Sequence, residues 1–174
     1  MGSGVSLGGQ IDASGWSSDW TIGSEAANPW TRARVARHGL LALTKEEAVY
    51  FTRNTDSAGE RLIEGCDYRV KGEAMPAQWW SITLYNADSF LPDNTDNALS
   101  YDLTDAQAAG DAGTWYFDIS PVSSESGAGW VSSRGAGSFD LTLRLYKPHA
   151  ALLEDPERAL PAPQIEKLGC GEPS

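Results

Sequence analysis

A strictly alternating segment near the end of the chain constrains the fold more than any other feature. Over residues 138–146 every second residue is apolar, and polar or aromatic residues stand between. The apolar set is Phe139, Leu141, Leu143 and Leu145, and the other set is Asp140, Thr142, Arg144 and Tyr146. A period of two places the two sets on opposite faces of a β-strand. The segment therefore predicts a strand with one buried and one wet face, ended by Pro148.

Further segments have strand-like composition, and turn-forming stretches such as Asp56-Ser-Ala-Gly separate them. These segments cover residues 50–52, 66–71, 79–86, 99–103 and 114–120. Short strands with no helix between them predict a mainly β fold, an antiparallel jelly-roll-like β-sandwich. We expect the C-terminal tail not to extend the sheet, because it contains Pro156, Pro161, Pro163 and Pro173.

An arm and a helix precede these strands. Residues 1–27 are rich in Gly and Ser, and we expect an extended arm held down by the side chains of Trp16 and Trp20. Asn28-Pro29 is typical of a helix start, with the asparagine as N-cap. The sequence therefore predicts one principal helix over residues 28–38.

The chain of 174 residues is long enough to close one hydrophobic core. We predict a single domain over residues 28–170 and a short tail at 171–174. Thirteen Lys and Arg against 24 Asp and Glu give a net charge of −11, which disfavours binding to nucleic acid or an anionic membrane. No apolar run approaches the roughly 18 residues of a membrane span. Both a lost N-terminal anchor or signal and a natural soluble start are compatible with the first residues.

Two cysteines, Cys66 and Cys170, have no histidine at a ligand-type spacing, so zinc binding is not indicated. A disulfide between them would fix a Gly-rich tail and would fit an oxidising compartment such as a periplasm. In a cytosolic protein, two unpaired buried thiols would be the ordinary interpretation. We favour the disulfide.

Several sequence blocks, in order along residues 28–170, resemble the DUF1214 family. They are the run from Arg32 to Phe51, Cys66-Asp-Tyr-Arg-Val, Gln78-Trp-Trp-Ser-Ile-Thr-Leu-Tyr, Ser138-Phe-Asp-Leu-Thr-Leu-Arg-Leu-Tyr-Lys-Pro, Leu160-Pro and Cys170. The resemblance implies a jelly-roll-like β-sandwich of bacterial origin. It also implies proteins that often carry an N-terminal signal or a single membrane anchor. It brings no activity with it.

Charge is unevenly distributed along the chain. Residues 72–133 contain no Lys or Arg, and within them Asp93-Asn-Thr-Asp96-Asn is dense in oxygen ligands of the kind that Ca²⁺ prefers. The order of an EF-hand loop is absent, and Asp and Asn are also common in turns, so we favour a solvated turn.

A basic island lies on the predicted helix and comprises Arg32, Arg34, Arg37 and His38. It suits either an anion clamp formed by Arg34, Arg37 and His38, or pairing with the chain's own carboxylates, which we favour.

Aromatic and polar side chains share one face of two predicted strands. In residues 79–86, the set of Trp80, Ile82 and Leu84 reads as core, and Trp79 and Tyr85 lie on the other side. If this strand pairs with residues 138–146, one surface carries Trp79, Tyr85, Asp140, Arg144 and Tyr146, which we call the aromatic face. Such a surface suits a sugar ring or a planar apolar ligand. The alternative, which we favour slightly, is that a helix or the N-terminal arm covers it.

Motifs for catalysis are weak. There is no nucleophile elbow or phosphate-binding loop, and His38 and His149 are the only histidines. We expect a non-catalytic module of the bacterial periplasm or cell envelope, without cofactor, that binds a glycan, a lipid or a protein partner through the aromatic face. The alternative is a carbohydrate-active enzyme, a lyase or hydrolase, that uses Arg, His and carboxylates in a cleft.

Overall fold

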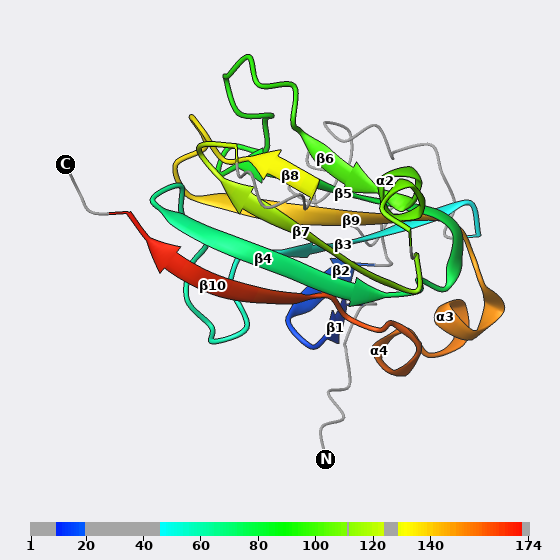
Figure 1. Ribbon diagram of the computed structural model, residues 1–174. Coiled ribbons are helices and arrows are strands. Elements are labelled where there is room, and N and C mark those ends of the chain that lie inside the picture. Colours follow the sequence, from blue (N-terminus) through cyan, green and yellow to red (C-terminus); the bar gives the residue numbers. More distant parts are fainter. Residues whose placement is uncertain (1–9, 20–45, 111, 124–128, 172–174) are drawn as a thin grey trace.

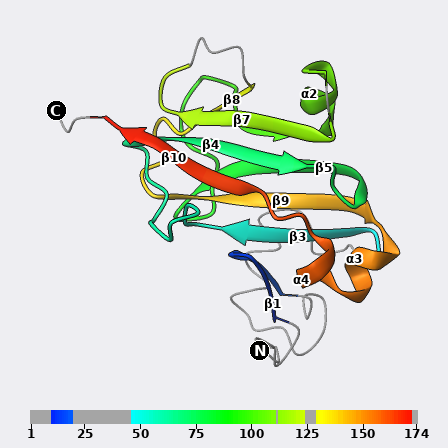
Figure 2. The same cartoon turned by 60° about the horizontal axis from the view of Figure 1, so that its bottom comes forward.

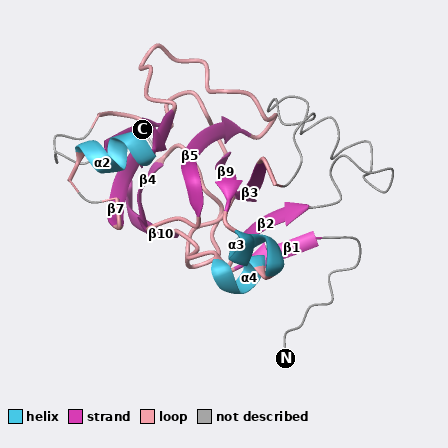
Figure 3. Cartoon of the chain, turned by 90° about the vertical axis from the view of Figure 1, so that its right-hand side faces the viewer, coloured by secondary structure: helices cyan, strands magenta, loops and turns pink. Residues whose placement is uncertain are grey.

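The computed structural model describes residues 10–19, 46–110, 112–123 and 129–171, and these residues form two packed β-sheets (Figure 1). The larger sheet has the strand order β1 (Gln10–Ala13), β2 (Trp16–Asp19), β3 (Ala48–Arg53), β9 (Phe139–Pro148), β5 (Ala77–Asn86) and β6 (Ser100–Asp102). The smaller sheet has the order β10 (Gln164–Cys170), β4 (Cys66–Glu73), β7 (Thr114–Ser120) and β8 (Gly129–Ser132). Seen end-on in Figure 3, β7 and β4 lie in one layer and β5, β9 and β3 in the other.

Alternation along the strands builds the core between these layers. On β9, Leu141, Leu143 and Leu145 are fully buried and stand opposite Leu84, Ile82 and Trp80 of β5, respectively. The smaller sheet contributes buried residues such as Val70, Phe117 and Ile119. Burial of such side chains is the main favourable contribution to folding. The sequence pattern of residues 138–146 therefore predicted the right strand and the right buried face.

An aromatic cluster fills the end of the core near β6. Trp80, Tyr101, Trp115 and Phe117 have ring centroids between 4.5 and 6.2 Å apart. Gly72 on β4 lies directly against the six-membered ring of the Trp115 indole, where a side chain would have no room. The indole Nε1 of Trp115 donates a hydrogen bond to the carbonyl oxygen of Glu73 (2.8 Å). Close packing of this kind leaves little freedom to shift a ring.

Three short helices lie at the edges of the described sandwich: α2 (Leu103–Ala108), α3 (Ala150–Glu154) and α4 (Pro156–Ala159). Helix α2 begins with a reciprocal capping box between Asp102 and Asp105. This cap ends β6 at Asp102, so the predicted strand over residues 99–103 is shorter than expected.

The mainly β fold predicted from the sequence is confirmed, with one exception to its antiparallel character. Strands β7 and β8 pair in parallel, whereas every other described pair is antiparallel. Strands β1, β2, β8 and β10 were not predicted. The turn expected at residues 56–59 is present, and an isolated bridge between Thr55 and Arg61 closes it.

The prediction that prolines keep the tail out of the sheets is wrong. β10 pairs with β4 along residues 164–170 and forms the edge of the smaller sheet, as Figure 2 shows. The reason is the position of the prolines relative to the strand. Pro156, Pro161 and Pro163 all precede the strand, so every residue from Gln164 to Cys170 retains a backbone N–H for pairing.

Part of the predicted N-terminal arm is a hairpin of β1 and β2. Its turn places Ser14 and Gly15 at positive φ, 52° and 95°. Trp16 is fully buried, and its Nε1 donates to the carbonyl oxygen of Pro163 (2.8 Å), so this tryptophan does hold the segment down. Trp20 and the predicted helix over residues 28–38 lie outside the described residues.

A disulfide joins Cys66 at the start of β4 to Cys170 at the end of β10, with the two sulfurs 2.06 Å apart. The two residues stand directly opposite each other in the strand register. Among the described helices, none combines the length and apolar character needed to cross a membrane.

Candidate functional site

The predicted pairing that creates the aromatic face is present in the structure. β5 and β9 run antiparallel, and Trp79 stands opposite Tyr146 while Tyr85 stands opposite Asp140. Arg144 stands opposite Ser81 and, on its other side, opposite Tyr50 of β3. The face therefore lies on the side of the larger sheet that points away from the core. All residues that the sequence assigned to it come together.

Direct contacts join four members of the aromatic face in two pairs. The Arg144 guanidinium donates from Nη2 to the Tyr85 hydroxyl oxygen (2.7 Å). Burial raises the pKa of Tyr85, and the nearby positive charge of Arg144 opposes this shift only in part. The rings of Trp79 and Tyr146 have centroids 5.5 Å apart and planes tilted by 54°. Such a tilted pair is a favourable arrangement of two aromatic rings.

Burial is uneven across the aromatic face. Its centre is closed to solvent: Thr142 is fully buried, and Ser81 and Tyr85 are each 8 % exposed. Trp79, Asp140, Arg144 and Tyr146 are half-buried. Burial shows that the centre of the face is covered, and the ligand role expected for this face stays a prediction. The centre is buried, and the Trp79–Tyr146 end remains accessible in part.

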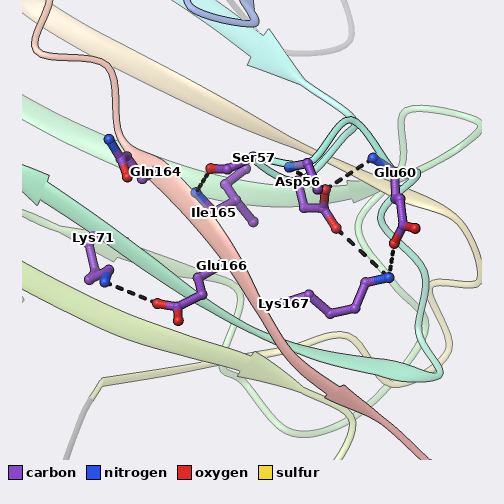
Figure 4. Close-up of a pocket in the computed structure, with 9 residues that line it drawn as sticks. Asp56, Ser57, Glu60, Lys71, Gln164, Ile165, Glu166 and Lys167 are labelled. Carbon is purple, nitrogen blue, oxygen red and sulfur yellow. Dashed lines mark hydrogen bonds and ion pairs between the residues drawn. The ribbon is translucent and has the colours of Figure 1, made fainter.

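A cavity of about 530 Å³ lies at the other side of the sandwich, between the loop after β3 and strand β10 (Figure 4). Most of the residues that line it have polar or charged side chains, although carbon atoms supply about half of the lining surface. The lining residues are Asp56, Ser57, Ala58, Glu60, Lys71, Gln164, Ile165, Glu166 and Lys167. The Lys167 ammonium binds the Glu60 carboxylate and lies 4.0 Å from Asp56 Oδ2. Hydrogen bonding to Glu60 raises the pKa of Lys167. Lys71 pairs with Glu166 at 3.0 Å, so the two lysines of the cavity already have carboxylate partners.

The acidic loop predicted as a solvated turn or calcium site is held by an arginine. Arg134 donates to both carboxylate oxygens of Asp96, at 2.7 and 3.0 Å, and Ser132 Oγ donates to one of them. These hydrogen bonds, first from Arg134 and then from Ser132, lower the pKa of Asp96. Asp93 is exposed. In the part of the chain that the structure describes, no group of three or more His, Cys, Asp or Glu could hold a metal ion.

The remaining candidates from the sequence make no described side-chain contact with the aromatic face or lie beyond the described residues. The anion clamp of Arg34, Arg37 and His38 falls outside them. His149 is exposed and precedes α3, where its side chain makes no capping hydrogen bond. The carboxylate pair Asp102 and Asp105 caps α2, and burial raises the pKa of Asp105.

Sequence reasoning missed the polar cavity. The Asp56-Ser-Ala-Gly stretch did signal a turn, and Asp56 Oδ1 indeed accepts from the backbone N–H of Ala58 (2.8 Å) and Glu60 (3.0 Å). The expected Cys66–Cys170 disulfide brings the tail to this part of the chain, but it does not place Lys167, more than 100 residues away in sequence, at the turn. Only recognition of β10 as a strand would have placed it there.

Comparison with known proteins supports the fold and adds no activity. A family model described as "Protein of unknown function (DUF1214)" matches residues 47–150. No curated protein matches the chain. The VPA0106 protein from Vibrio parahaemolyticus has a similar structure, with a TM-score of 0.60 and 21% identity, over 75% of this chain and 33% of that one. This chain therefore spans about one third of the length of the Vibrio protein. An uncharacterized protein from Burkholderia cenocepacia aligns with a TM-score of 0.42 and 17% identity, over 84% of this chain and 45% of that one.

Proposed function

The chain belongs to the DUF1214 family, and from that premise we propose that it is a non-catalytic module of the bacterial cell envelope that binds a glycan at the Trp79–Tyr146 end of the aromatic face. The single observation that carries the proposal is this ring pair. Two aromatic side chains stand opposite each other on an outer sheet face, half-buried and 5.5 Å apart, with Arg144 and Asp140 on the same face.

A sugar ring presents an apolar C–H face and a rim of hydroxyl groups. Aromatic rings with an apolar body match the first, and charged or amide groups nearby match the second. Trp79 and Tyr146 supply the apolar contact in this proposal. Arg144 lies two residues before Tyr146 on β9, and its hydrogen bond to Tyr85 holds the guanidinium toward the centre of the face, where it bounds the proposed site. Because the centre of the face is buried, the ligand would contact its Trp79–Tyr146 end only.

The disulfide and the family resemblance support an envelope location, and the net charge bears on the choice of ligand. Disulfides persist in oxidising compartments and are rare in the cytosol, and here the disulfide closes a loop of 104 positions. The net charge of −11 disfavours anionic lipid and nucleic acid as ligands, which leaves neutral surfaces as better partners. The family resemblance in the sequence, to proteins with a signal or anchor, agrees with such a location.

The test is an array of bacterial envelope glycans probed with the purified chain, with neutral lipid vesicles and envelope proteins as parallel arms. We expect glycan binding that Trp79→Ala or Tyr146→Ala weakens about tenfold, which corresponds to about 1.4 kcal/mol of stacking. Tyr116→Ala is the matched control, because Tyr116 is also an exposed aromatic residue (44 %) but lies on the smaller sheet. Circular dichroism checks that each variant folds.

Three results would contradict the proposal. They are no glycan binding, glycan binding that survives both substitutions in the ring pair, and equal weakening by Tyr116→Ala. Binding to vesicles or to a protein alone would assign the face to a different class of partner. Fractionation of cells with the native gene product in the cytosol would contradict the envelope location.

A further inference from the structure

Strand β10 forms the edge of the smaller sheet and is attached to it very unequally along its length. It pairs with β4 on one side, and of its seven residues only Ile165 is buried. Near Ile165 the strand is also held on its other side, where Ile165 and Ser57 exchange two hydrogen bonds of 2.8 and 3.0 Å. The first part of β10 thus has an apolar anchor and hydrogen bonds on both edges.

The second part of β10, residues 167–170, has no such anchor. Leu168 is 49 % exposed, and Gly169 and Cys170 are exposed as well. Apart from its pairing with β4, this part is held by the Lys167 ion pairs, by the Cys66–Cys170 disulfide and, just beyond the strand, by a hydrogen bond of 2.7 Å from the Gly171 N–H to the Gly65 carbonyl oxygen. Partly exposed ion pairs contribute little to stability. The disulfide is therefore the strongest restraint on this half of the strand.

Lys167, the first residue of this half of β10, places its ammonium against a buried carboxylate. Asp56 is only 1 % exposed, and its Oδ2 has no hydrogen bond but faces the Lys167 ammonium at 4.0 Å (Figure 4). A charge in such a position depends on its counter-ion. If the strand lifts, Asp56 loses Lys167 but gains water, and this hydration offsets the lost ion pair. Local opening here removes little favourable contact once the covalent link is cut.

We propose that the Cys66–Cys170 disulfide is a redox latch: its reduction releases residues 167–170 from β4 and uncovers Asp56 in the polar cavity. Cys170 is the exposed partner and Cys66 is buried, so a dithiol reductant attacks the Cys170 sulfur. Cys66 leaves as a thiolate and takes up a proton. The second thiol of the reductant then attacks the mixed disulfide, releases Cys170 as a thiol and leaves the reductant as a disulfide. Two electrons and two protons pass from the dithiol to the protein.

The experiment labels carboxylates with a carbodiimide and glycine ethyl ester, in the oxidised and the dithiothreitol-reduced chain, and reads the sites by mass spectrometry. Asp118 is the internal control, since it is 5 % exposed and is held by Arg69 between β4 and β7. We expect labelling of Asp56 to rise about tenfold on reduction while Asp118 stays protected, as for a local opening. Reoxidation should restore the protection of Asp56.

Variants separate the latch from other effects. Cys170→Ala removes an exposed sulfur and should reproduce the reduced pattern without reductant, whereas Leu168→Ala on the same strand should leave Asp56 protected. Amide hydrogen exchange of residues 166–170 should rise in parallel with Asp56 labelling. The proposal is overturned if Asp56 stays protected in the reduced chain and in Cys170→Ala. It is equally overturned if Asp118 becomes labelled together with Asp56, because the disulfide would then hold the whole sandwich rather than one strand end.

Discussion

Replacement of Gly72 by alanine tests the packing of the smaller sheet against a single ring. A Cβ atom at this position would lie 2.1 Å from Cζ2 of Trp115 and within 2.7 Å of two further atoms of the same six-membered ring. The ring would have to move by more than 1 Å, roughly, to restore an ordinary contact. Trp115 is buried and its centroid is 4.5 Å from that of Trp80, so no free space is available for this movement.

The expected decrease in the free energy of unfolding of Gly72→Ala combines two effects. Overpacking of a filled core destabilises by about 1–3 kcal/mol. A displaced indole also weakens its hydrogen bond to the Glu73 carbonyl, which contributes about 1 kcal/mol. Together they predict that Gly72→Ala lowers the free energy of unfolding by about 3 kcal/mol and Tm by about 9 °C.

The assay is urea denaturation of the oxidised chain, arranged as a double-mutant cycle. Trp115→Phe removes the ring atoms that the new methyl group meets, so the double variant should be more stable than the sum of the single effects by about 1–2 kcal/mol. Gly65→Ala is the control, because a Cβ there meets nothing within 4 Å, and we expect it to be neutral or slightly stabilising. A loss below about 1 kcal/mol for Gly72→Ala, or strictly additive effects, would refute the packing argument.

Three further predictions concern single interactions. Trp16→Phe removes the donor to the buried Pro163 carbonyl and should lower the free energy of unfolding by about 2 kcal/mol in the same denaturation assay. Arg134→Gln should raise the pKa of Asp96 toward its ordinary value in an NMR titration. In the wild type the lowered pKa means that this interaction stabilises the fold above about pH 4 and is lost as the pH falls through the lowered value. Burial is the main cause that raises the pKa values of Tyr68 and Tyr85. Their neutral phenols therefore favour the folded state below about pH 10, and this contribution is lost as the pH rises through the raised pKa values. In an alkaline titration, phenolate absorbance should therefore appear at higher pH in the folded chain than in the unfolded chain, and Tyr85→Phe should reduce this difference.

The alternation of apolar and polar residues correctly predicted those strands that have one buried and one outward face. The alternation around Leu143 determines both a strand and its buried face, and the same logic on residues 79–86 found the partner strand. The pairing of these two strands was the condition on which the sequence assigned residues to the aromatic face, and the structure contains that pairing. Whether that face is open depends on what else packs there, and periodicity along a strand carries no information about this.

Strands without alternation were missed. β10 reads Gln-Ile-Glu-Lys-Leu-Gly-Cys, with one buried residue, and its preceding prolines suggested a non-strand tail. β8 is short and parallel to β7, a pairing that a chain of hairpins does not suggest. The polar cavity depends on β10, so Lys167 and Asp56 were missed with it. Tertiary pairing, and not local preference, decides such edge strands.

The bond between Trp16 and Pro163 spans 147 positions, and it has a consequence for the order in which the chain becomes structured. During synthesis Trp16 emerges early, yet its acceptor is made near the end of the described sequence. The same holds for Cys66, whose partner follows 104 positions later. The anchoring of the β1–β2 hairpin and the β10 edge of the smaller sheet are therefore completed only when residues 163–170 have left the ribosome. Long-range closure of this kind slows folding, so we expect the described sandwich to reach its full stability only after β10 has been made and has paired with β4.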